Sequence, residues 1–256
     1  MLKVFEIELA LPPETHINSS MGSVFQGALM ELLSEDLAAE LHQVGLRPYS
    51  QAVFFDREKQ KPVWRLCSLN DFAETEIIKP ALESEVIFLK QKNFSVQLLN
   101  KKQICSTTFE QLADNYFRSE DVPYGTDLTF RTVTSFKRDG GYVIIPEMYL
   151  IFQSLLNKWN TYSPDIKLKE ENLENHLADA CRIVKYNLHS EAFYIEKKKI
   201  YGFSGQMRIL FHGNDLVKRV LALILSIAPY AGVGIKTAIG MGAAQCSILF
   251  HKDNSL

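Results

Sequence analysis

Near its C-terminal end the chain reads Ala231-Gly232-Val233-Gly234-Ile235-Lys236-Thr237-Ala238-Ile239-Gly240-Met241-Gly242. Four glycines fall within eleven residues here, and a lysine and a threonine lie at the centre of the cluster. Glycine adopts positive φ angles without penalty and lets another backbone approach closely, so the cluster predicts a loop that exposes main-chain N–H groups. Together with the lysine charge and the threonine hydroxyl, such a loop suits a phosphate group.

Two well-known glycine loops of nucleotide-binding proteins do not match this segment. The dinucleotide fingerprint G-x-G-x-x-G requires a glycine where Thr237 stands, and the P-loop G-x-x-x-x-G-K-[ST] requires one where Ile235 stands. The dinucleotide loop also leads from a strand into a helix, whereas here a helix pattern precedes the loop and a strand pattern follows it. Nucleotide binding is therefore disfavoured. A helix-to-strand turn, whose glycines serve only backbone geometry, remains an alternative.

Apolar periodicity on both sides of the loop outlines the second half of the chain. It predicts a helix over residues 215–228 before the loop and a strand over residues 243–250 after it. The other elements expected in this half are a hairpin of residues 129–136 and 142–146 around Asp139-Gly140-Gly141, a helix over 148–159, and strands over 183–195 and 201–211.

The first half shows a similar order of elements. They are a strand over residues 3–11, helices over 20–33 and 36–44, strands over 50–55 and 63–69, a helix over 74–82, and strands over 85–89, 94–99 and 103–108. This β-α-β-β-α-β order is the ferredoxin-like arrangement of RNA-recognition domains. The sequence therefore predicts an α+β fold of two tandem ferredoxin-like (RNA-recognition-type) domains, residues 1–120 and 121–256, joined near residues 114–128.

Composition places the chain among ordinary soluble globular proteins. Of its 256 residues, 46% are hydrophobic and 23% are charged. No charge-free apolar run reaches the roughly 18 residues of a membrane span, and the acidic residues Glu6 and Glu8 are unlike a signal peptide. The four cysteines are widely scattered, which predicts reduced core residues rather than a zinc site or a disulfide framework. We expect a cytoplasmic protein with no membrane partner.

Charge is unevenly distributed along the chain. The net charge of −2 counts against a general nucleic-acid binder, which usually carries a basic excess. The first 40 residues hold one lysine and seven acidic residues, whereas residues 182–219 hold eight lysines and arginines and three acidic residues. The basic stretch favours a local phosphate-binding face. For Lys197-Lys198-Lys199 alone, a solvated lysine-rich hairpin is an equal alternative.

The whole loop pattern, G-x-G-x-x-T-x-x-G-x-G between a helix and the last strand, resembles the glycine-rich signature of the CRISPR repeat-processing endoribonucleases. These enzymes are the sixth Cas family, within the RAMP superfamily. Their signature usually ends in Gly-Phe-Gly, where this chain has Gly240-Met241-Gly242. Two further segments are similar to the family: residues 26–30, followed by a Leu-His-x-x-Gly motif over residues 41–45, and the run 130–146. The resemblance spans nearly the whole chain.

The resemblance implies a reaction that needs neither a metal nor another cofactor. In this family the 2′-hydroxyl next to the scissile phosphate of a CRISPR repeat attacks that phosphate and leaves a 2′,3′-cyclic phosphate and a 5′-hydroxyl. The step requires a base for the 2′-hydroxyl, an acid for the leaving oxygen, and positive charge near the phosphorane. The implied partner is the precursor transcript that carries the repeats.

Three residues are candidates for catalysis. His42 occupies the position that matches the family's catalytic histidine, and a histidine can serve as acid or base near neutral pH. Arg47 is the nearest cation beyond it and can hold charge on the phosphorane, but it cannot act as a base because it does not deprotonate. Many family members carry a tyrosine where this chain has Met30, so His16 could supply the missing acid or base. For both histidines an ordinary surface position is the alternative.

The glycine-rich loop supplies the candidate RNA contacts, which are Gly232, Gly234, Lys236, Thr237, Gly240 and Gly242. Aromatic residues that alternate with the basic ones of residues 182–208 could stack on bases or fill a core, namely Tyr186, Tyr194, Tyr201 and Phe203. The remaining histidines have no companions at metal-ligand spacing, so no metal site is expected: His176, His189, His212 and His251.

Two other functions remain open at this level. A noncatalytic RNA-binding RAMP protein could hold a repeat-derived RNA handle in an effector complex with other Cas proteins, and Met30 in place of tyrosine favours this alternative. A small-molecule enzyme on a ferredoxin-like scaffold could use the loop to hold a substrate phosphate. The sequence also leaves open whether the protein forms a homodimer and which repeat it recognises.

Overall fold

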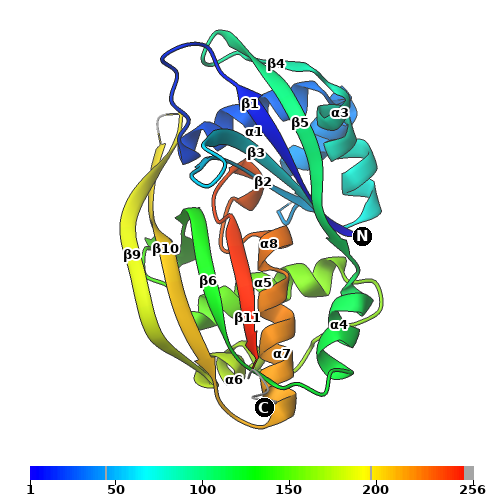
Figure 1. The fold of residues 1–256 in the computed structure, drawn as a ribbon, viewed down its shortest axis with the longest axis vertical. Coiled ribbons are helices and arrows are strands. Elements are labelled where there is room, and N and C mark those ends of the chain that lie inside the picture. The colour runs from blue at the N-terminus through cyan, green and yellow to red at the C-terminus, as the bar shows by residue number, and fades with distance from the viewer. Residues whose placement is uncertain (44, 197, 251–256) are drawn as a thin grey trace, which may run out of the picture.

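The structure, a computed structural model, describes residues 1–43, 45–196 and 198–250. Its two large sheets are antiparallel and stand next to each other, each with helices packed on one face, and a two-stranded sheet is separate from them (Figure 1). The α+β fold class is thereby confirmed. Val44, Lys197 and His251, which the sequence predictions include, lie outside the described residues. Within the described ranges, every helix is too short or too polar to cross a membrane.

The first sheet is built from residues 2–107 in the order β2-β3-β1-β5-β4. Its strands are β1 (Leu2–Ala10), β2 (Tyr49–Asp56), β3 (Lys61–Ser68), β4 (Val86–Leu89) and β5 (Phe94–Thr107). Its helical segments are η1 (Ser19–Met21), α1 (Gly22–Glu31), α2 (Glu35–Gln43), the π-helical turn η2 (Ala73–Ile78) and α3 (Lys79–Glu83). With β4 as an added edge strand, this is a ferredoxin-like sheet.

The second sheet has the strand order β11-β6-β10-β9. Its strands are β6 (Pro123–Thr134), β9 (Cys181–Ile195), β10 (Lys198–Phe211) and β11 (Ala244–Phe250), and a separate hairpin pairs β7 (Phe136–Arg138) with β8 (Gly141–Val143). The helical segments are α4 (Phe109–Phe117), α5 (Met148–Tyr162), α6 (Leu173–Asp179), α7 (Asp215–Ser226), α8 (Ala228–Ala231) and η3 (Thr237–Ile239). Both sheets therefore follow the ferredoxin-like order, which confirms the predicted tandem fold.

The structure corrects several predicted elements. β5 is one long strand rather than two, because bulges opposite β1 absorb the shift in register. Residues 129–134 belong to the long strand β6, so the hairpin around Asp139 is only β7–β8. The sequence patterns also missed α6 and α4, although α4 begins with a capping box. There the Gln111 N–H donates to Thr108 Oγ1 and the Thr108 N–H donates to Gln111 Oε1, both at 3.1 Å.

One apolar core extends from the first sheet into the second half. Leu2 and Val4 of β1 are at most 2% exposed and belong to the same cluster as residues of α5, α7 and β6. Helix α4 joins this cluster, where Phe109 meets Trp159 edge-on with ring centroids 5.0 Å apart. A second core lies between the first sheet and α1. Residues 109–117 come before residue 120 but pack with the second half. The predicted domain boundary at residue 120 stays a prediction.

Candidate functional site

The glycine-rich loop, residues 232–242, lies where the two halves meet (Figure 1). A Cβ atom placed on Gly240 would lie 2.8 Å from the Cα of Gly22, the first residue of α1, so the two backbones are in direct contact. From β2, Gln51 Nε2 donates to Gly22 O at 2.8 Å and to Ala238 O at 3.3 Å. The loop is therefore fixed to the first half by a close contact between two backbones and by the side chain of Gln51, so it lies between the halves as predicted.

Backbone geometry accounts for glycine in this loop more directly than phosphate binding does. Gly242 has φ of 69°, and a Cβ atom there would lie 2.0 Å from the carbonyl oxygen of Val233. The N–H groups of three loop glycines are already bonded inside the protein: Gly232 to Ala228 O, Gly234 to Ser154 Oγ and Gly242 to Val133 O, each at 2.9 Å. The predicted RNA contacts of this loop thus depend chiefly on the side chain of Lys236, and they stay a prediction.

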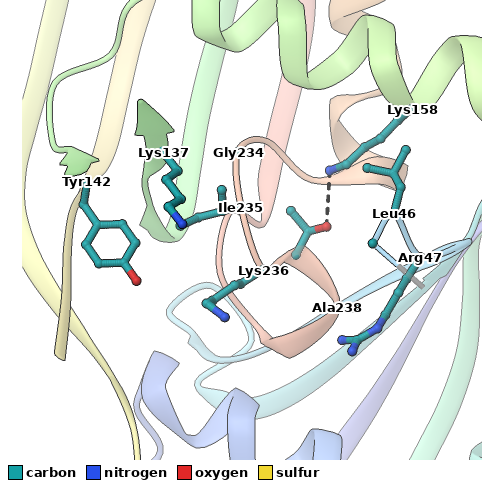
Figure 2. A pocket seen from close by; sticks show the side chains of 11 residues that line it. Leu46, Arg47, Lys137, Tyr142, Lys158, Gly234, Ile235, Lys236 and Ala238 are labelled. Atoms are coloured by element: carbon teal, nitrogen blue, oxygen red, sulfur yellow. Dashed lines mark hydrogen bonds between the residues drawn. The ribbon is translucent and has the colours of Figure 1, made fainter. Parts of the chain in front are cut away.

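A buried lysine supports the loop from below. Lys158 of α5 is 4% exposed, and its Nζ donates to Ala231 O at 2.6 Å, Gly232 O at 3.0 Å and Thr237 Oγ1 at 3.2 Å. Figure 2 marks the bond to Thr237. All three ammonium protons therefore have an acceptor, but none of the acceptors carries a charge. Burial lowers the pKa of Lys158 to about 7. Lys158 fixes the start and the centre of the loop in place.

Lys158 is not among the residues that the sequence motifs single out. Helical spacing places it beside Leu155 and Trp159, which are fully buried, so a lysine interrupts the apolar face of α5. This interruption was the signal that could have identified it, because a lysine is almost never buried without a specific partner. Hydrophobic periodicity does not identify Lys158 as buried, because a lysine is normally assigned to the solvent side of a helix.

A cavity of about 400 Å³ opens between the loop, the β7–β8 hairpin and the segment that follows α2. Four basic residues line it, Arg47, Lys137, the buried Lys158 and Lys236, and its lining includes no carboxylate (Figure 2). Burial lowers the pKa of Lys236, and the positive charges of Arg47, Lys198 and Lys137 lower it further. Like charges held together in this way favour an anionic ligand.

Of the predicted site residues, the structure brings Arg47 together with Gly234, Lys236 and Thr237 around the cavity. Arg47 is anchored there because its Nε donates to Leu41 O at 2.8 Å, close to the C-terminal end of α2. This bond ties the cavity wall to the helix turn that carries His42.

The two candidate histidines are less central. His42 is exposed on the last turn of α2, and the segment from Gly45 to Arg47 continues from this turn to the cavity, which His42 itself does not line. His16 is exposed in the segment between β1 and η1 and is also absent from the cavity lining. Gly232, Gly240 and Gly242 belong to the loop without lining the cavity.

Met30, at the family's tyrosine position, and Tyr49, two residues after Arg47, both serve the core of the first half. Met30 packs half-buried against the core beneath α1. Tyr49 is 1% exposed, and its hydroxyl accepts from Gln26 Nε2 at 2.7 Å. Burial raises the pKa of Tyr49, so this tyrosine serves the core of the first half rather than the cavity.

The aromatic residues of β9 and β10 differ in burial, and base stacking by the exposed ones stays a prediction. Phe203 is 2% exposed and packs in the core, whereas Tyr186, Tyr194 and Tyr201 are more than half exposed. Lys199 Nζ lies 5.5 Å from the ring centroid of Tyr194 and 4.6 Å from that of Tyr201. In the described part of the chain, His, Cys, Asp and Glu side chains do not gather in groups of three or more that could hold a metal ion.

Comparisons with known proteins agree with the sequence motifs. Residues 128–244 match the family model described as CRISPR-associated endoribonuclease Cas6. Two similar proteins carry that name: one from Streptococcus thermophilus is 28% identical over 231 residues (90% of this chain and 93% of the relative), and one from Mycobacterium tuberculosis (strain H37Rv) is 26% identical over 249 residues (96% and 78%). The resemblance to the sixth Cas family is thereby confirmed.

Solved structures confirm the fold. A Cas6 product complex has a TM-score of 0.78 at 23% identity and covers 96% of this chain and 100% of that chain. Thermus thermophilus Cas6 has a TM-score of 0.71 at 22% identity and covers 96% and 98%.

Proposed function

We propose that this chain, a relative of the CRISPR-associated endoribonuclease Cas6, cuts CRISPR repeat RNA as a metal-independent endoribonuclease. The observation that carries the proposal is the cavity between the halves, whose lining holds four basic residues and no carboxylate. The segment that leads into this cavity carries His42 at its start and Arg47 at its end. A phosphodiester suits such a wall, and the relatives named endoribonucleases support RNA as its source.

In the proposed reaction, the 2′-oxygen forms a bond to phosphorus while the bond from phosphorus to the 5′-oxygen breaks. A base takes the proton of the 2′-hydroxyl, and an acid gives a proton to the leaving 5′-oxygen. The products are a 2′,3′-cyclic phosphate and a 5′-hydroxyl, so no water and no metal-bound hydroxide enters this step.

His42 is the proposed base or acid, because it is exposed on the helix turn whose Leu41 carbonyl accepts a hydrogen bond from Arg47 of the cavity lining. Arg47 is proposed to stabilise the charge of the phosphorane, and its guanidinium lies beside the loop that carries Lys236 (Figure 2). His16 is the proposed second proton carrier, since Met30 packs into the core and has no proton to exchange.

A noncatalytic role in holding an RNA handle is the second candidate. It is favoured by the place of His42, which lies outside the cavity that Arg47 and Lys236 share. End-labelled repeat RNA incubated with the protein in EDTA separates the two functions. Cleavage with cyclic-phosphate ends supports the endoribonuclease, retention of intact RNA supports the handle-binding role, and the absence of any RNA binding contradicts both.

Lys236→Ala should weaken binding of repeat RNA and lower the slope of log K against log salt by about one. Stability should hardly change, because Lys236 is surrounded by Arg47, Lys198 and Lys137, whose charges repel it. Filter binding at several KCl concentrations measures the effect, and thermal melting measures the stability. Lys92→Ala, an exposed lysine on the turn between β4 and β5, is the matched control. Equal affinity and slope in Lys236→Ala and the unmutated protein would show that the loop is only structural.

A further inference from the structure

The hydroxyl of Thr237 lies between the buried Lys158 and the cavity. Thr237 is 8% exposed and lines the cavity, and its Oγ1 accepts a hydrogen bond from Lys158 Nζ at 3.2 Å (Figure 2). A hydroxyl has two lone pairs and one proton, so this bond occupies a lone pair and leaves the proton for another acceptor. Within the described residues, that proton has no acceptor from the protein itself. It is therefore available to a ligand in the cavity.

Two loop glycines fix the orientation of the Thr237 side chain. A Cβ atom on Gly232 would lie 2.8 Å from the methyl carbon of Thr237, and one on Gly242 would lie 3.2 Å from it. The methyl group therefore takes the space that side chains at these two positions would need. With the methyl held there, rotation about the Cα–Cβ bond is restricted and Oγ1 stays beside Lys158. The direction of the hydroxyl proton is what can still change.

The protonation state of Lys158 decides this direction. As an ammonium group, it donates its three protons to the carbonyl oxygens of Ala231 and Gly232 and to Thr237 Oγ1. As a neutral amine, it has two protons and one lone pair. The two carbonyl groups can only accept, so Thr237 is the partner that can donate to this lone pair. The hydroxyl proton would then point to Nζ and away from the cavity.

We propose that Lys158 is a positioning residue for RNA binding, which in its charged form directs the Thr237 hydroxyl to donate to an oxygen of the RNA phosphate. This inference rests on the proposed function, in which that phosphate lies in the cavity. Phosphate oxygens accept hydrogen bonds, so the hydroxyl adds a directed donor to the charges of Arg47 and Lys236 that line the same wall. By reciprocity, a bound phosphate favours the charged form of Lys158, so RNA binding and protonation of this residue support each other.

The proposed contact depends on pH near neutrality, because burial lowers the pKa of Lys158 to about 7. Below this pH the lysine is charged and the hydroxyl proton is available to the phosphate. Above it the neutral amine holds that proton, and RNA gains the contact only if Lys158 takes up a proton first. The contribution of the Thr237 hydroxyl to RNA affinity is therefore complete below about pH 7 and decreases as the pH rises.

Other ionisable groups surround Lys158, but they titrate equally in variants that differ only at position 237. On the elements packed around Lys158 these groups are Arg47, Lys137 and Lys236 at the cavity, Tyr162 on α5 and Tyr230 on α8. Burial raises the pKa of both tyrosines, that of Tyr162 to about 12, so both stay neutral in this range. Comparing Thr237→Val with the unmutated protein at each pH therefore isolates the hydroxyl.

Thr237→Val keeps a methyl group against the two glycines and removes the hydroxyl. Its affinity for repeat RNA with a 2′-deoxy nucleotide at the cut site, which is not cleaved, should be about tenfold weaker than that of the unmutated protein at about pH 6. The ratio of the two affinities should approach one at about pH 9. Thr237→Ser should keep the pH dependence of the unmutated protein. Thr161→Val, at an exposed threonine of the same helix α5, is the control and should leave affinity unchanged at every pH.

Lys158→Met tests whether the lysine acts through the hydroxyl. In this background Thr237→Val should change RNA affinity by the same factor at every pH, and thermal melting shows whether each variant folds. Calorimetry in two buffers of different ionisation enthalpy gives a second readout, because RNA binding at about pH 8 should take up a proton that Lys158→Met does not take up. An affinity ratio that is constant with pH when Lys158 is present, or equal proton uptake in both proteins, would overturn the inference. An unmutated protein that binds no RNA would contradict the proposed function as well.

Discussion

His42→Ala should lower the rate of repeat-RNA cleavage by about 10²–10⁴-fold, the usual effect of removing one proton-transfer group. His42 follows Leu41, whose carbonyl accepts from Arg47 of the cavity lining, so His42 is the proposed proton carrier nearest in sequence to that wall. RNA affinity should hardly change, because a neutral imidazole contributes little to phosphate binding. Single-turnover cleavage and filter binding, measured on the same preparation, separate the two effects.

Gln43→Ala is the matched control for this prediction, because Gln43 is the exposed neighbour of His42 on α2. It should cleave at the rate of the unmutated protein. A substrate with a 2′-deoxy nucleotide at the cut site should bind and stay intact, since its nucleophile is absent. Full activity in His42→Ala would transfer the role to His16 or another group, and activity that disappears in EDTA would contradict the mechanism itself.

Lys158→Met should remove a pH dependence of stability that the unmutated protein carries. Burial lowers the pKa of Lys158 to about 7 in the folded protein, whereas an unfolded chain has a lysine pKa of about 10.4. Between these values the unfolded state binds a proton that the folded state does not bind. Raising the pH therefore favours the folded state, by up to about 1.4 kcal/mol for each pH unit. Below this window both states are protonated, and above it both are neutral.

Urea unfolding of both proteins across this window measures the effect as the difference between their free energies of unfolding. The difference removes the contributions of other groups that titrate at alkaline pH, such as Cys67, whose pKa is raised by burial to about 11. The charges that face the same cavity as Lys158 are the cations Arg47, Lys137 and Lys236. Lys92→Met is the control for loss of an exposed lysine. A difference that stays constant from neutral to alkaline pH would show that Lys158 has an ordinary proton affinity.

Sequence patterns predicted the fold well where each element is long and is bounded by a turn. The glycine cluster after a helix and before the last strand correctly placed residues 232–242 at the end of the second half, and alternation in residues 3–11 correctly predicted β1. The division of β5 into two strands was wrong, because alternation in the sequence is broken by a bulge even when the strand itself continues.

The site was predicted less completely, for a physical reason. Arg47 and Lys236 come from distant parts of the sequence but line one cavity, and only their charge and the adjacent motifs singled them out. The glycines drew attention as possible phosphate contacts, whereas in the structure Gly242 and its neighbours use their N–H groups to close the loop. Lys158 was missed because its place on the apolar face of α5 indicates burial only, while the three acceptors that surround it belong to a distant segment of the sequence.

The core shared by the two halves has a consequence for the order in which the chain folds on the ribosome. Leu2 and Val4 share one buried cluster with residues of α5 and α7, and β1 itself packs against α8; all three helices are synthesised long after β1. The first sheet must therefore leave part of one apolar face in water until most of the chain has emerged. A nascent chain in this state is open to aggregation and to capture by chaperones. Native burial of β1 is thus delayed by the time that the ribosome needs to synthesise the second half.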